Sequence, residues 1–64
     1  MNITSGTYAP TKRDGRGRIS HIARVVTAVS PGVVSFHPLG QDRPMVTPTA
    51  DFVAWAEIAR VVRL

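Results

Sequence analysis

The sequence predicts a small, mostly β domain, and three features support that fold class. First, β-branched residues dominate the apolar set, with nine valines and four isoleucines against two leucines, and there are six threonines besides. Such side chains are stiff at χ1 and fit a pleated strand better than a helix. Second, short apolar runs alternate with segments containing proline and glycine, which favour turns. Third, 64 residues leave room for one domain only, residues 1–64.

The first part of the chain predicts two strands joined by a basic loop. Residues 1–8 contain Ile3 and Tyr8 as anchors for a short first strand. Residues 9–18 combine a proline and two glycines with most of the positive charge, so we expect a mobile loop there. Residues 19–29 are the best strand candidate. Neither of its faces is uniformly apolar, which indicates a long, twisted strand interrupted by a bulge.

A tight turn at Ser30-Pro31-Gly32 is the clearest local signal in the sequence. Proline presets the backbone of a turn's second position, and glycine accepts the positive φ that a type II turn requires next. The flanking valine-rich segments, residues 25–29 and 33–36, therefore read as two arms of a hairpin. In this hairpin Val34 and Phe36 point together into the core.

The last third predicts a third hairpin arm, a short helix and a final strand. Residues 45–47 form the arm, after a loop that contains Gly40. Thr49 is the expected N-cap of a helix of one or two turns, and Asp51 places negative charge near its positive end. Residues 58–64 are β-branched again and read as an edge strand. One helical face carries apolar residues at i, i+3, i+4 and i+7, namely Phe52, Trp55, Ala56 and Ala59.

Together these elements follow the order β-β-β-β-α-β. Five short strands with tight turns and one short helix near the C-terminus predict a small SH3-like barrel, which leaves few strand edges open. A flat three-stranded sheet with a docked helix is the alternative. The absence of cysteine excludes disulfides and thiolate zinc sites, and we expect neither a metal nor a cofactor.

The positive charge lies almost entirely in the first half of the chain. The formal net charge is +4, and the arginines and acids after Gly32 cancel each other. Glycines let a backbone approach a phosphate chain closely, and the flanking cations displace condensed counterions when they bind it. The alternative is a solvated loop whose charge only keeps the protein soluble. The candidate contacts for nucleic acid or an acidic partner are Lys12, Arg13, Arg16, Arg18 and Arg24.

The remaining side chains favour a binding protein over an enzyme. Tyr8, beside the basic loop, is the aromatic residue that we expect to be partly exposed and able to stack on a base. Phe36, Phe52 and Trp55 are expected to be core residues, since a domain this small needs aromatic side chains in its interior. The two histidines have no oriented nucleophile or base beside them in the sequence, so we expect no catalytic residues.

Membrane association is not expected. No apolar stretch approaches the roughly 20 residues that a spanning helix needs, and the first residues lack a signal-peptide pattern. A cytoplasmic protein is therefore the expectation. The high apolar content of so short a chain also allows a homodimer.

The order of several short motifs resembles a group of small proteins encoded by bacteriophages and prophages. The motifs are Gly6-Thr7-Tyr8, Asp14-Gly15-Arg16-Gly17-Arg18, a hairpin with Val34 and Phe36, and Phe52 with Trp55-Ala56. The resemblance implies an SH3-type barrel and a viral accessory role inside the host cell. Such a role is binding of nucleic acid through the basic loop. The alternative is modulation of the host, by an inhibitor or adaptor that binds a host or phage protein through the basic surface or the sheet edge at residues 58–64.

Overall fold

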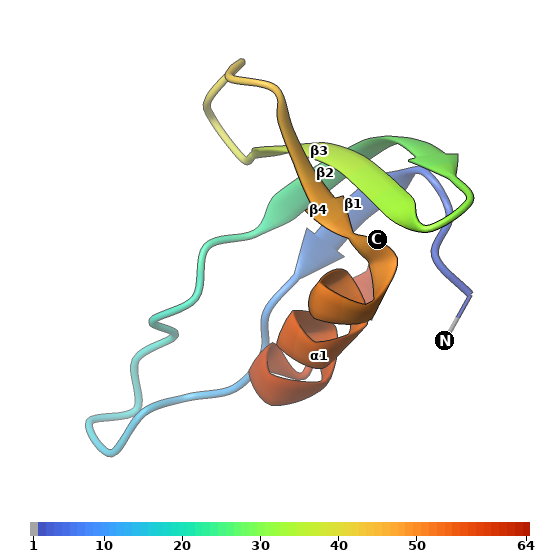
Figure 1. The fold of residues 1–64 in the computed structure, drawn as a ribbon. Coiled ribbons are helices and arrows are strands. Elements are labelled where there is room, and N and C mark those ends of the chain that lie inside the picture. Colours follow the sequence, from blue (N-terminus) through green and yellow to red (C-terminus); the bar gives the residue numbers. More distant parts are fainter. Residues whose placement is uncertain (1) are drawn as a thin grey trace.

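A curved antiparallel sheet with one helix packed against it makes up the protein (Figure 1). The structure is a computed structural model that describes residues 2–64. The strands lie in the spatial order β4-β3-β2-β1-β5, so the chain returns after the helix to pair with its first strand. This arrangement confirms the predicted fold class, a small, mostly β domain of five short strands with one short helix near the C-terminus. The elements are β1 (Gly6–Ala9), β2 (Arg24–Ser30), β3 (Val33–Pro38), β4 (Met45–Pro48), α1 (Thr49–Ala59) and β5 (Val62–Arg63).

The hairpin of β2 and β3 is the longest pairing in the sheet, and its turn is the predicted one. Ser30 pairs with Val33, and Gly32 between them has a φ of 80°, a conformation that glycine adopts without strain. The register shifts between Val26 and Ala28, which confirms the expected bulge in this strand. The bulge lets Val26 remain in the core while the end of β2 turns toward solvent.

Strand β2 begins at Arg24, five residues later than the expected start at residue 19. Both neighbours of β2 end at this point, because β1 reaches only to the Tyr8–Arg24 pair and β3 ends at Pro38 opposite Arg24. One further bond, from the Leu39 N–H to the Ala23 carbonyl at 2.9 Å, continues past this pair before the two segments separate. The first strand is likewise shorter than residues 1–8, and Met1 lies outside the described residues.

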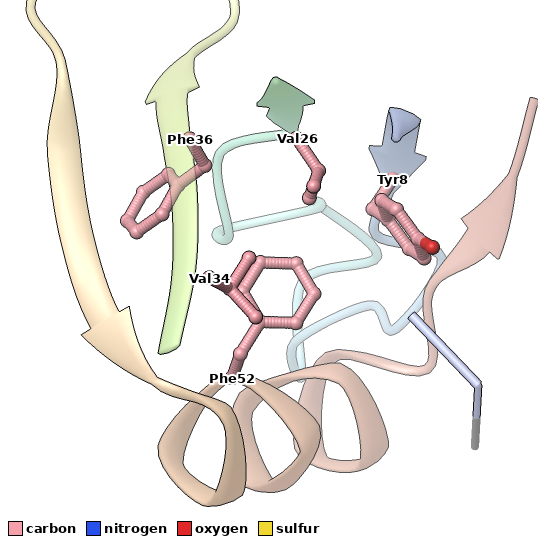
Figure 2. Packing of buried hydrophobic residues seen from close by; sticks show 5 residues of the cluster. All are labelled: Tyr8, Val26, Val34, Phe36 and Phe52. Carbon is pink, nitrogen blue, oxygen red and sulfur yellow. The ribbon is translucent and has the colours of Figure 1, made fainter. Parts of the chain in front are cut away.

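One aromatic side chain of the helix fills the centre of the core (Figure 2). Phe52 is fully buried, and its ring centroid lies 5.4 Å from that of Tyr8, 6.0 Å from that of Phe36 and 5.3 Å from that of Trp55. The pairs are tilted or edge-to-face, the geometry that aromatic rings favour. The helical face predicted from the i, i+3, i+4, i+7 spacing is therefore confirmed.

The helix begins one residue earlier than predicted and is longer. Pro48 occupies the N-cap position without a side-chain cap, and Thr49 is the first helical residue, so the prediction of Thr49 as N-cap is wrong. The Thr49 N–H donates instead to the Gly32 carbonyl at 3.0 Å, which ties the helix to the β2–β3 turn. Asp51 lies in the first turn as predicted. The described residues contain no helix with the length and apolar character needed to cross a bilayer.

The end of the helix corrects the expected strand at residues 58–64. Ile58 and Ala59 belong to α1, whose inward face holds the fully buried Ala59, and only Val62–Arg63 forms the edge strand β5. Arg60 stops the helix in a left-handed conformation with a φ of 51°. Its N–H donates to the Ala56 and Glu57 carbonyls, and the Val61 N–H returns to Ala56. This is a Schellman-type cap without the usual glycine.

Replacing Arg60 by glycine should stabilise the protein. A side chain in the left-handed region costs roughly 1 kcal/mol, which glycine avoids, although the more flexible unfolded chain offsets part of the gain. We expect the Arg60→Gly variant to raise the free energy of unfolding by about 0.5 kcal/mol in urea titrations. The matched variant Arg60→Ala removes the same side chain but keeps the strain, and it should leave stability unchanged. A gain of equal size in both variants would contradict this interpretation of the cap.

Candidate functional site

The basic cluster lies on a small hairpin that we call the basic hairpin, residues 12–18. Arg13 and Ile19 form an isolated antiparallel bridge at its base. The Asp14 N–H donates to the Arg18 carbonyl at 2.8 Å, and the Gly17 N–H donates to the Asp14 carbonyl at 3.0 Å. Gly17 has a φ of 76°, so a turn followed by a left-handed glycine closes the hairpin. The structure thus shows a hydrogen-bonded hairpin where the sequence predicts a mobile loop. The mobility itself stays a prediction.

Asp14 organises the hairpin through backbone N–H groups. Its carboxylate oxygen Oδ1 accepts the N–H of Arg16 at 2.8 Å and the N–H of Arg18 at 3.0 Å. Aspartate at this turn position commonly accepts N–H groups two or more residues ahead. None of the side-chain hydrogen bonds found within residues 2–64 joins a basic side chain to a carboxylate. The acid therefore shapes the loop and leaves the neighbouring cations available to a partner.

All four cationic side chains of the basic hairpin are exposed. Lys12, Arg16 and Arg18 make no side-chain hydrogen bond within the described chain, whereas the Arg13 guanidinium donates to the Gly17 carbonyl at 2.7 Å. The segment between β1 and β2 reaches away from the sheet and helix on one side of the molecule (Figure 1). Three cationic side chains thus extend into solvent from a projecting loop, and the fourth, that of Arg13, stabilises the loop through its hydrogen bond.

The start of this loop is attached to the C-terminal end of the helix. The N–H groups of Thr11 and Lys12 both donate to the Ala59 carbonyl, at 3.1 and 3.0 Å. The Thr11 hydroxyl donates to the Arg60 carbonyl. These donors satisfy carbonyl groups that a helix end leaves unpaired. The basic hairpin is consequently held at a fixed point of the fold while its tip extends outward.

Arg24, the fifth predicted contact, lies apart from the basic hairpin. It is half-buried at the start of β2, where its guanidinium stacks 4.0 Å from the Trp55 ring centroid and 4.7 Å from that of Phe36. Burial lowers the pKa of this guanidinium from its ordinary value, although arginine remains charged at neutral pH. Both rings attract the cation through their faces. Arg24 therefore belongs to the border of the aromatic core.

Tyr8 cannot stack on a base, which corrects the prediction from the sequence. Its side chain is 2% exposed and packs in the core beside Phe52. The Tyr8 hydroxyl donates to the Thr4 carbonyl at 2.8 Å and accepts the Thr4 N–H at 2.9 Å, so its polar end is satisfied internally. Trp55, expected in the core, is instead the half-buried aromatic residue.

Sequence reasoning missed two features of this region, and each has a recognisable signal. An aspartate followed three residues later by glycine, as in Asp14 and Gly17, is typical of a hairpin turn with a left-handed last residue. The i, i+2 spacing of Arg24 and Val26 puts both on one strand face. Since Val26 pairs with the inward-facing Phe36, this spacing indicates that Arg24 faces the aromatic residues.

Histidines and acidic residues do not assemble into a metal site in the described part of the chain. No group of three or more His, Asp or Glu side chains is positioned to hold a metal ion there. His37 has its Nδ1 atom 2.9 Å from the Pro38 carbonyl oxygen, and His21 lies near the start of β2.

Comparison with known proteins gives no relative from which a function can be transferred. No protein-family model, curated protein or solved structure matches the chain. The resemblance to phage-encoded proteins consequently stays a prediction, and function has to be argued from the site itself.

The Asp14 carboxylate should be required for the shape of the basic hairpin. In Asp14→Ala, the N–H groups of Arg16 and Arg18 lose their acceptor, and each such hydrogen bond contributes about 1–3 kcal/mol. Amide hydrogen exchange measured by NMR should accelerate about tenfold or more at Arg16 and Arg18 and remain unchanged in β2 and β3. Asp14→Asn keeps the Oδ1 acceptor and should behave like the original protein. Fast exchange in Asp14→Asn as well would show that charge rather than geometry holds the loop.

Proposed function

We propose that this protein is a non-enzymatic accessory protein that binds nucleic acid by placing the basic hairpin against the phosphate backbone. The observation that carries the proposal is the state of the cations: Lys12, Arg16 and Arg18 are exposed on a projecting loop whose only acid accepts backbone N–H groups. Cations in this state gain from replacing condensed counterions on a phosphate chain.

The geometry of the loop supports backbone contact more than base-specific recognition. Specific recognition in the major groove requires a helix or a two-stranded ribbon that inserts side chains in a fixed array. The basic hairpin is held by one isolated bridge, between Arg13 and Ile19, and is too short for such an array. Its glycines at positions 15 and 17 let the backbone approach phosphates closely. We therefore expect weak sequence preference and strong dependence on salt.

A second candidate function is docking on an acidic host or phage protein. It is favoured by the two open sheet edges, β4 and β5, which carry the exposed side chains of Val46 and Val62, with the exposed Leu64 directly after β5. An open edge can pair with a strand of another protein, and the same arginines would face acidic groups. In this second function, the protein would modulate the host by binding one of its proteins, without nucleic acid. The same edges could also join two copies of the chain in a homodimer.

Binding to nucleic acid should weaken steeply with salt in a way that depends on the basic hairpin. With three or four phosphate contacts, the slope of log K against log salt should be about −2 to −4. The double variant Arg16→Ala/Arg18→Ala should reduce this slope by about 1.4–1.8, since each lost contact removes roughly 0.7–0.9. Fluorescence anisotropy with labelled single-stranded and duplex oligonucleotides at several salt concentrations measures both quantities.

The matched control is Arg43→Ala, which removes an exposed arginine from the segment between β3 and β4. It changes the net charge by one unit but should leave the slope unchanged. Absence of binding to every oligonucleotide at low salt would overturn the proposed function and leave docking on a protein as the remaining candidate. A slope that is unchanged in the hairpin variant would place the binding surface elsewhere.

A further inference from the structure

An open groove lies on the concave face of the sheet beside Arg24. Its volume is about 390 Å³, within the range of about 300–1,000 Å³ that is typical of ligand sites. The start of β2, the end of β3 and the start of β4 meet here, since Arg24 pairs with Pro38 and Phe36 pairs with Met45. The helix begins at the opposite end of these strands, next to Gly32, and its Trp55 side chain lines one side of the groove.

The guanidinium of Arg24, in the groove, has N–H donors that are available to a ligand. The guanidinium carbon of Arg24 lies over the rings of Trp55 and Phe36, 4.0 and 4.7 Å from their centroids. Within residues 2–64 no acceptor forms a hydrogen bond with its N–H groups. These N–H groups lie in the plane of the guanidinium, around its edge. A guanidinium held in this way matches an oxygen anion that approaches in its plane, such as a phosphate.

The walls of the groove are apolar and flank the cation. Ile22 and Met45 are 63% and 43% exposed, and both line the groove together with the half-buried Trp55. Apolar side chains and an aromatic ring beside an anion site suit a ligand that combines a flat π-face with a negative group. A nucleotide is such a ligand, because its base can pack against these apolar side chains while its phosphate meets the guanidinium.

The groove is also continuous with the basic hairpin along the chain. Residues 20–22 line the groove and follow directly after the hairpin, so that at most about 14 Å of extended chain separates Arg18 from Ile22. The hairpin and the groove therefore lie within reach of one nucleic-acid strand. In a duplex both faces of each base are already stacked, whereas an unpaired base is free to enter.

We infer that the groove beside Arg24 accepts one unpaired nucleotide, so that the preferred ligand of the protein is single-stranded nucleic acid. This inference rests on the proposed function and adds the class of ligand to it. The basic hairpin supplies contacts shared by single strands and duplexes, and the groove supplies the preference between them.

Trp55 is the only tryptophan and provides the readout. Titration with a 12-nucleotide oligothymidylate should quench its fluorescence to saturation, and an oligouridylate of equal length tests RNA in the same way. A 12-base-pair duplex should bind, as seen by anisotropy, with little quenching. Equal quenching by the duplex and the single strand would overturn the inference. Equal quenching by a polyglutamate peptide would also overturn it, because the groove would then recognise negative charge alone and fit an acidic protein.

Two variants with the same change in net charge distinguish direct contact in the groove from long-range electrostatic repulsion. Met45→Glu places a carboxylate in the groove, whereas Val46→Glu places one on the opposite face of the same strand, at a residue paired with Ser35. Met45→Glu should weaken binding of the single strand about tenfold more than Val46→Glu, and the two should bind the duplex equally. Equal losses on the single strand would refute the groove. Failure of all oligonucleotides to bind the unmodified protein would instead refute the proposed function together with this inference.

Discussion

The structure depends on the insertion of Phe52 from the helix into the concave face of the sheet. This fully buried ring contacts Tyr8 on β1, Phe36 on β3 and Trp55 on its own helix. Each aromatic pair contributes about 0.5–1.5 kcal/mol beyond the area that it buries. A domain of this length has a total stability of roughly 3–10 kcal/mol, so three such pairs form a large part of it.

The same aromatic cluster determines where a partner can bind. The helix begins at the Gly32 end of the strands, and the groove lies at the Arg24 end of the concave face. Trp55 and Phe36 then support the guanidinium of Arg24 at the edge of the core. At its other end the helix offers the Ala59 carbonyl to the N–H groups that begin the basic hairpin. One packed helix thus positions both the groove and the hairpin.

Local signals in the sequence were sufficient for the architecture and insufficient for the site. The Pro31-Gly32 turn and the spacing of Phe52 and Trp55 depend on neighbouring residues, and both were predicted correctly. The burial of Tyr8 and the stacking of Arg24 depend on which strands become neighbours, which no short segment encodes. Thr49 was misassigned for a similar reason, since its N–H is satisfied by Gly32, a residue distant in the sequence.

Equilibrium unfolding in urea, followed by two probes, tests most directly whether one aromatic cluster unites helix and sheet. Trp55 fluorescence reports the contact between the helix and the sheet, and far-ultraviolet circular dichroism reports the backbone of both. If Phe52 joins them as described, the two signals change in a single transition with the same midpoint. A fluorescence transition at clearly lower urea than the dichroism transition would show that the helix separates while the sheet persists, and would contradict the account.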